Sequence, residues 1–98
     1  MMDIKEILEN GKYVIEYEES ESELFNDYHA KFKVVEGYIE YLDKKYKFML
    51  HVESYFDGTD FENYKELYIN DKSIKDIDLI DTAYNKIHKT LIKQILNQ

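Results

Sequence analysis

Residues 31–56 read KFKVVEGYIEYLDKKYKFMLHVESYF, a pattern of alternating apolar and polar side chains that predicts a β-hairpin. We expect its arms to be Lys31–Leu42 and Lys45–Phe56, joined by a turn near Asp43-Lys44. The apolar side chains at every second position of the second arm share one face: Tyr46, Phe48, Leu50 and Val52. In the first arm the alternation slips at Val34-Val35, which predicts a β-bulge or bend there.

The segment before the hairpin predicts one more strand and then a connection. Apolar and polar residues alternate from Lys12 to Glu19. Three side chains of this strand are expected on one face: Tyr13, Ile15 and Tyr17. Ser20–His29 is polar and acidic, so we predict a long connection there, with room for one helical turn capped by Ser20 and Glu23.

Helices are predicted at both ends of the sequence. Asp3 can cap the first, with Glu6 three residues later, and Asn10-Gly11 ends it. The second helix carries apolar residues at spacings of three and four, which form one stripe: Ile80, Tyr84, Ile87, Leu91 and Ile95. Asp78 is the expected cap of this helix, with Asp81 at the third position.

Together these elements predict a two-layer α+β fold in a single globular domain, residues 1–98. A short strand around Glu66–Asn70, turning at Asn70-Asp71 towards Ser73-Ile74, follows the hairpin. We therefore expect an antiparallel sheet of about four strands, centred on the hairpin 31–56. A short N-terminal helix and a long C-terminal helix should pack on one face of that sheet.

Composition narrows the class of protein. The 98 residues include 10 tyrosines and 13 lysines but no arginine, cysteine, proline or tryptophan, and the net charge is -8. Such acidity argues against nucleic acid or an anionic membrane as a direct partner. The chain shows neither a secretory signal nor an apolar run long enough to span a membrane, so we expect a cytoplasmic protein.

Most of the negative charge lies early in the chain. Residues 1–30 hold nine acids and two lysines, and between Lys12 and Lys31 there are six carboxylates and no cation. This run predicts an electronegative patch that binds a basic protein surface, and its alternative is a solvated loop that only keeps the protein soluble. The residues expected to bind the partner are Glu16, Tyr17, Glu18, Glu19, Glu21, Glu23, Asp27 and Tyr28.

Motifs for catalysis or for binding a cofactor are missing. The serines have no G-x-S-x-G context, the three glycines are isolated, and the histidines show no pair at helical ligand spacing. The acids of segment 57–62 surround a glycine but lack the spacing of an EF-hand, so a turn is the better interpretation. We expect no enzyme activity, no cofactor and no metal site.

In size and charge the chain is similar to three kinds of small acidic inhibitor: phage-encoded anti-CRISPR proteins, inhibitors of uracil-DNA glycosylase, and immunity proteins that neutralise nuclease toxins. The resemblance implies a protein that blocks the basic groove of a nuclease or other nucleic-acid-handling enzyme by mimicking phosphates. The use of lysine as the only cation fits an AT-rich genome, such as that of a low-GC bacterium or its phage. We favour a phage-type anti-defence inhibitor acting in the host cytoplasm.

Two alternatives remain open at the level of sequence. The chain could be a structural or adaptor protein that forms a homodimer through a sheet edge or the C-terminal helix. It could instead be a small enzyme or ligand carrier with a pocket between sheet and helix, lined by polar groups such as His51 or Tyr84.

Overall fold

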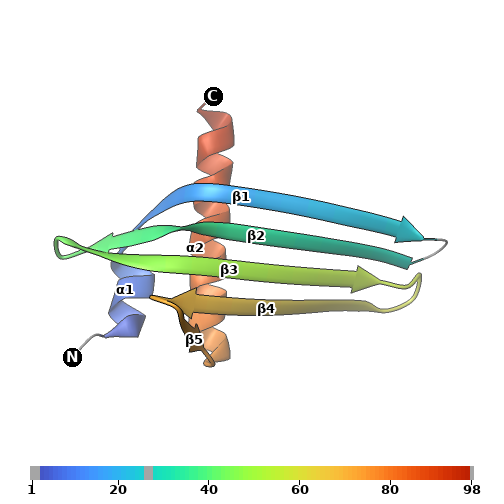
Figure 1. Cartoon of the computed structure of the whole chain (residues 1–98), viewed down its shortest axis with the longest axis horizontal. Helices are drawn as coiled ribbons and strands as arrows, with labels where there is room; N and C mark the ends of the chain where they lie inside the picture. The colour runs from blue at the N-terminus through green and yellow to red at the C-terminus, as the bar shows by residue number, and fades with distance from the viewer. Residues whose placement is uncertain (1–2, 26–27, 98) are drawn as a thin grey trace.

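The computed structural model describes residues 3–25 and 28–97, which form one antiparallel sheet of five strands and two helices (Figure 1). The elements follow in the order α1 Ile4–Asn10, β1 Lys12–Phe25, β2 Tyr28–Tyr41, β3 Lys44–Phe56, β4 Phe61–Ile69, β5 Lys72–Ile74 and α2 Ile77–Leu96. The strands lie in the sheet in chain order, so each pairs with its sequence neighbour. The predicted α+β class is confirmed, with five strands in place of about four.

Two tight turns connect strands in the way that the sequence predicts. Leu42 and Asp43 both have positive φ, 49° and 63°, and Asn70 and Asp71 have 49° and 67°. Two successive positive φ angles are the mark of a type I′ turn, whose twist matches that of the strands it joins. The hairpin turn therefore lies one residue earlier than predicted, and the predicted turn at Asn70-Asp71 is confirmed.

The predicted connection Ser20–His29 is wrong, because β1 continues to Phe25 and β2 already begins at Tyr28. No helical turn forms over residues 20–25. Ser20 lies opposite Lys33 and Ser22 opposite Lys31 in a regular ladder. Serine and glutamate are weak strand formers, so it is pairing with the long β2 strand that makes this segment extended.

The β-bulge lies in β1 and not in β2. Ile15 is opposite Gly37 and Tyr17 is opposite Glu36, so one extra residue, Glu16, is inserted between them. Tyr13 and Ile15 consequently face the helices while Tyr17 faces away, which contradicts their predicted common face. The bulge predicted at Val34-Val35 is wrong, because the ladder is continuous there on both sides.

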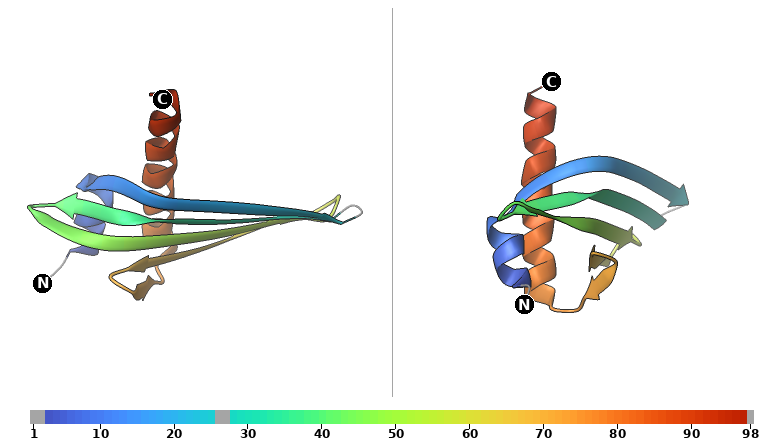
Figure 2. Two further views of the ribbon diagram at one scale, coloured as in Figure 1. Left: turned by 45° about the horizontal axis from the view of Figure 1, so that its top comes forward. Right: turned by 60° about the vertical axis from the view of Figure 1, so that its left-hand side comes forward.

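Both helices lie on one side of the sheet, which we call the inner face, and the other side is the outer face (Figure 2). Asp3 caps α1 by accepting a hydrogen bond from the Glu6 amide at 3.3 Å, as predicted. The cap of α2 is Asp76, whose carboxylate accepts from the amides of Asp78 and Leu79, so the predicted cap at Asp78 is wrong by two residues.

The core lies between the inner face and the two helices. Its sheet residues include the predicted apolar positions of β3, and they contact Ile7 and Leu8 of α1. The buried residues of α2 are Ala83, Ile87 and Leu91. The predicted stripe is therefore confirmed for its central part, whereas Ile95 is 67% exposed because α2 runs on past the sheet edge (Figure 1).

The sheet is longer than the layer of helices that covers it. The molecule measures 49 × 34 × 18 Å, and α2 crosses the strands steeply, on the α1 side of their middle (Figures 1 and 2). We call the far parts of β1 to β4, residues 19–25, 28–34, 51–56 and 61–66, the tip. They begin beside α2, where Lys65 pairs with Asp81, and their ends extend past it (Figure 1). Neither described helix combines the length and apolar character needed to cross a membrane.

Candidate protein-interaction face

The outer face of the sheet carries four cross-strand rows of glutamate and aromatic side chains, which we call the acidic–aromatic face. The residues of each row lie side by side in the ladder. From the bulge to the tip the rows are Tyr17–Glu36–Met49–Tyr68, Glu19–Val34–His51–Glu66, Glu21–Phe32–Glu53–Tyr64 and Glu23–Ala30–Tyr55–Glu62. Alternation along the strands, two residues per repeat, places all these side chains on one side.

Tyrosines and glutamates two residues apart on this face are hydrogen bonded. Tyr55 donates to Glu53 at 2.9 Å and Tyr64 donates to Glu62 at 2.8 Å. Tyr17 and Tyr68 donate in the same way to the glutamates of their own strands, Glu19 and Glu66. Each bond fixes the direction of a carboxylate that would otherwise rotate freely in solvent.

These bonds also change the acidity of the phenols. Donating to the Glu53 carboxylate raises the pKa of Tyr55 to about 12, because the neutral phenol is the form that can donate. The same cause, a bond to the neighbouring glutamate, raises the pKa of Tyr17, Tyr64 and Tyr68. All four phenols therefore remain neutral donors at physiological pH.

Aromatic rings form a cluster at the tip. Tyr55 is its centre, with its ring centroid 6.1 Å from that of Tyr28, 6.0 Å from that of Phe32 and 6.0 Å from that of Tyr64. Ala30, opposite Tyr55 in the ladder, is buried although it lies on the outer face. Tyr28 and Tyr64 remain about half exposed, so the cluster offers apolar surface between the carboxylates.

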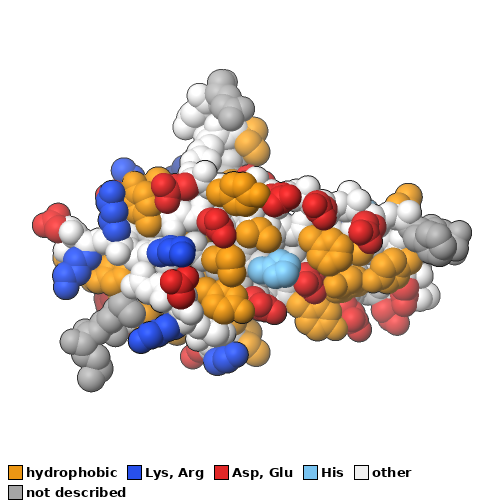
Figure 3. All heavy atoms as spheres, viewed as in Figure 1, with side chains coloured by type: hydrophobic (Ala, Val, Ile, Leu, Met, Phe, Trp, Pro, Cys, Tyr) orange, Lys and Arg blue, Asp and Glu red, His pale blue; other side chains and the backbone are white. Residues whose placement is uncertain are grey.

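The rows of this face carry carboxylates and a histidine, His51, whose Nε2 lies 3.4 Å from Glu53 Oε1. These rows contain seven carboxylates and, among the residues that the structure describes, no lysine: Glu19, Glu21, Glu23, Glu36, Glu53, Glu62 and Glu66. Figure 3 shows this side of the sheet with acidic and hydrophobic side chains over its right-hand part and lysines towards its left-hand end. At that end Lys45 lies 4.5 Å from the ring centroid of Tyr38, and Lys47 pairs with Asp71 at 3.2 Å.

The inner face of the tip carries the opposite charge. Lys31, Lys33 and Lys65 all alternate onto it. Lys33 pairs with Glu18 at 3.3 Å, and Lys65 pairs with Asp81 of α2 at 3.2 Å. Over the tip, the two-residue period of the strands thus places the glutamates of the rows on the outer face and the lysines on the inner face.

The predicted binding residues divide between these surfaces. Tyr17, Glu19, Glu21, Glu23 and Tyr28 come together on the acidic–aromatic face. Glu18 lies on the inner face against Lys33. Glu16 is the exposed extra residue of the bulge. Asp27 lies outside the described residues.

Sequence reasoning missed the acids and rings that β2, β3 and β4 add to the face. The available signal was a repeated spacing of two between tyrosine and glutamate, as in Glu53-x-Tyr55, Glu62-x-Tyr64 and Glu66-x-Tyr68. Neighbouring residues in a strand point to opposite faces, so only this spacing places both side chains together.

The acidic segment after β3 forms a turn. The Asp57 carboxylate accepts hydrogen bonds from the Asp60 amide at 2.7 Å and from the Thr59 amide and hydroxyl at 2.9 and 3.0 Å. These bonds, that from Asp60 foremost, lower the pKa of Asp57. Within residues 3–25 and 28–97, no three His, Asp or Glu side chains are grouped so as to hold a metal ion.

Comparison of the chain with protein-family models, with curated proteins and with solved structures finds no match.

Proposed function

We propose that this protein binds the basic groove of a nucleic-acid-handling protein through the acidic–aromatic face and blocks it against DNA or RNA. The observation that carries the proposal is the separation of charge. Seven carboxylates without a lysine share one exposed face, although the described residues have lysines nearby on the other. A surface evolved only for solubility would mix the two signs and lower its self-repulsion.

The spacing of the carboxylates along the acidic–aromatic face is similar to the spacing of phosphates along a nucleic-acid strand. Residues two apart in a strand are separated by about 6.8 Å, so the four rows span about 20 Å and present roughly one charge per 3 Å. A single nucleic-acid strand carries about one charge per 3.4 Å of helix axis. A groove that has lysines and arginines placed for one strand would therefore find a comparable number of carboxylates on this face.

The tyrosines add contact area to this electrostatic match. The exposed rings of Tyr17, Tyr28 and Tyr64 lie among the carboxylates, where they can contact apolar stems of arginine and lysine or stack on guanidinium groups. We favour a bacterial defence nuclease or CRISPR effector as the target, which makes the protein a phage-type anti-defence inhibitor.

The experiment is an affinity capture with matched variants. The face variant carries Glu19→Gln, Glu21→Gln and Glu23→Gln. The control variant carries Glu9→Gln, Glu18→Gln and Asp43→Asn, which lie off the acidic–aromatic face. Both lose three negative charges, so a difference between them reports position and not net charge.

Each immobilised protein is exposed to a lysate of a low-GC bacterium that contains nucleases and CRISPR effectors, and eluted with a salt gradient. We expect the wild type and the control to retain one nucleic-acid enzyme and release it at moderate salt, because screening weakens exposed charge pairs. The face variant should not retain it, and DNA should compete with the wild type for the recovered enzyme. Equal retention by the face variant, or release that does not depend on salt, would refute the proposal.

A further inference from the structure

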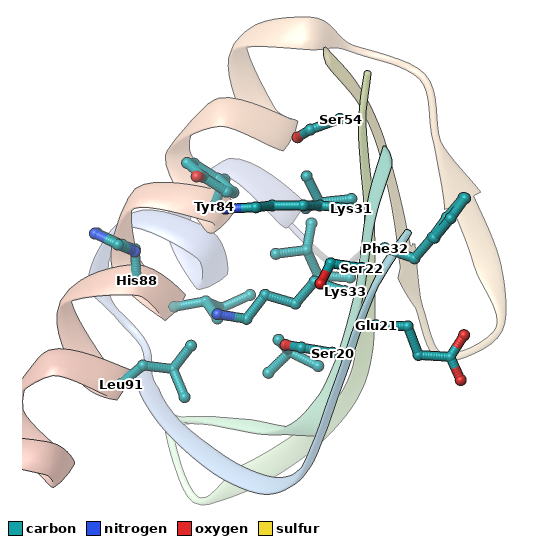
Figure 4. A pocket seen from close by; sticks show the side chains of 14 residues that line it. Ser20, Glu21, Ser22, Lys31, Phe32, Lys33, Ser54, Tyr84, His88 and Leu91 are labelled. Atoms are coloured by element: carbon teal, nitrogen blue, oxygen red, sulfur yellow. The ribbon is translucent and has the colours of Figure 1, made fainter. Parts of the chain in front are cut away.

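The inner face of the sheet contains a cavity that the proposed function does not use. It lies between α2 and the beginning of the tip and has a volume of about 410 Å³ (Figure 4). This volume is within the range of about 300–1,000 Å³ that is typical of small-molecule pockets. The cavity is on the opposite side of the sheet from the acidic–aromatic face.

The floor of the cavity is apolar. Val35, Leu50 and Val52 contribute it from the sheet, and Ile87 and Leu91 contribute it from α2. None of these side chains is more than 9% exposed, so the floor is the upper surface of the core itself. An apolar group that enters the cavity would be shielded from water on both sides.

The rim is polar and positively charged. Lys31 and Lys33 of β2 extend into the space between sheet and helix, whereas Glu21 and Phe32 point away from it (Figure 4). The hydroxyls of Ser20, Ser22 and Ser54 line the same side of the cavity. Tyr84 and His88, stacked with centroids 6.1 Å apart, line it from α2.

From this arrangement we propose that the cavity binds a small organic carboxylate with an apolar body. The apolar part lies on the floor of valine, leucine and isoleucine side chains, and the carboxylate is held at the rim by Lys31, Lys33 and the serine hydroxyls. The Lys33 ammonium group can pair with a carboxylate at this position, because the carboxylate of Glu18 already lies 3.3 Å from it. The ligand takes the place of Glu18 at that ammonium group.

The test uses the intact protein and three probes with the same apolar chain: octanoate, octanol and octylamine. Binding is followed by the backbone amide shifts of the ¹⁵N-labelled protein. We expect octanoate to shift the amides of cavity residues such as Lys33, Val52 and Leu91 in a saturable way. Octanol should bind more weakly, and octylamine should not bind, because the rim is positively charged.

Two single substitutions at the Lys33–Glu18 pair should change the affinity for octanoate in opposite directions. Lys33→Gln should lower the association constant for octanoate roughly tenfold, since it removes a charge-assisted hydrogen bond. Glu18→Gln should raise the association constant severalfold, because it removes the internal competitor for Lys33. Lys47→Gln on the outer face is the matched control and should leave binding unchanged.

Three results would overturn the inference: no saturable shifts with octanoate, binding of octanol as tight as that of octanoate, or identical octanoate binding by wild type, Lys33→Gln and Glu18→Gln. The face variant leaves Lys31, Lys33 and Glu18 unchanged, so each proposal can fail without the other.

Discussion

At the scale of single residues, the hydrogen-bonded pairs of tyrosine and glutamate set the chemistry of the outer face. In each pair a phenol donates to a carboxylate two residues away on the same strand. The carboxylate gains a fixed direction and the phenol loses acidity. The proposed recognition of a cationic partner depends on the first effect, because it is the directed carboxylates that would meet the cations.

The first prediction concerns the pair Tyr55–Glu53. Tyr55 should ionise near pH 12, well above the ordinary value of 10.0, and Glu53→Gln should lower this pKa because the bond to the carboxylate is its largest cause. A raised phenol pKa favours the folded state while the group is protonated. This stabilisation is present below pH 10 and is lost as the pH rises towards 12.

The measurement is an NMR titration of the Tyr55 ring, assigned with Tyr55→Phe, over the pH range in which circular dichroism shows the fold intact. Glu36→Gln, which removes a glutamate from a different row, serves as control and should leave the Tyr55 titration where it is. The prediction is wrong if Tyr55 titrates with the ordinary phenol pKa of 10.0, or if Glu53→Gln leaves the pKa of Tyr55 unchanged.

The second prediction concerns Gly37, which lies beside the bulge. A Cβ added there would lie 2.0 Å from the carbonyl oxygen of Val14 and 3.0 Å from the Cα of Ile15. Both are backbone atoms of the neighbouring strand, so relief requires the strands to separate. We expect Gly37→Ala to lower the free energy of unfolding by about 1–3 kcal/mol, as overpacking does.

Urea unfolding of the variant and the wild type measures this loss. Ser73→Ala in the exposed part of β5 is the comparison and should stay within about 0.5 kcal/mol of the wild type. A Gly37→Ala protein as stable as the wild type would show that β1 and β2 can move apart freely at the bulge.

At the scale of elements, α2 shows how far a periodic pattern determines burial. Leu91 and Ile95 belong to the same predicted stripe, but Leu91 is 8% exposed against the core and Ile95 projects beyond the sheet. Leu91→Ala should therefore cost about 2–5 kcal/mol of stability, and Ile95→Ala should change it by less than about 0.5 kcal/mol. Thermal and chemical unfolding of the two variants, which differ by one helical turn in position, provide the test. Equal losses would mean that the end of α2 is covered in solution.

The sequence was sufficient to predict an element wherever its local pattern of apolar residues matches the face that is buried. The apolar alternation from Tyr46 to Val52 and the spacing of Ile80, Tyr84 and Ile87 placed β3 and α2 correctly, because each pattern reflects a buried face. The turn at Asn70-Asp71 was predicted in place because both residues tolerate positive φ. The hairpin turn was predicted one residue too late, because only the clear strands on either side of it indicated its position.

The sequence was insufficient to predict a segment whose structure depends on pairing with another strand. The segment from Ser20 to Glu23 has no apolar residue, and only its ladder with β2 makes it a strand. The alternation of apolar and polar residues slips at Val34-Val35 because both faces of the sheet carry apolar side chains there. Val35 is buried on the inner face and Val34 is half-buried on the outer face, and no bulge is needed. Glu19, Glu21 and Glu23 of β1 were predicted as binding residues and lie on the outer face. The residues of β3 and β4 that share their rows were missed because they are distant in sequence.

At the scale of the whole molecule, the uncovered tip gives the protein an elongated form. Its Cα radius of gyration is 14.7 Å, compared with about 13 Å for a compact chain of 100 residues. We expect the protein to be a monomer with this shape, because pairing of two β1 edges would bring Glu19, Glu21 and Glu23 of both copies together.

Small-angle X-ray scattering coupled to size-exclusion chromatography tests shape and mass together. The radius of gyration should remain near that of the single chain, and the mass should not change over a wide range of protein concentration. A mass that doubles with concentration would favour the homodimer alternative, and the face variant would then show whether β1 forms the contact.

The order of the elements also has a consequence for synthesis on the ribosome. The five strands pair with their sequence neighbours, so each hairpin can close over a short loop as soon as it emerges. The helix that covers the inner face, α2, is made after all of them. Until α2 is made, the apolar side chains of the sheet that pack against it remain exposed to water. Completion of the core during synthesis therefore waits for the twenty residues of α2.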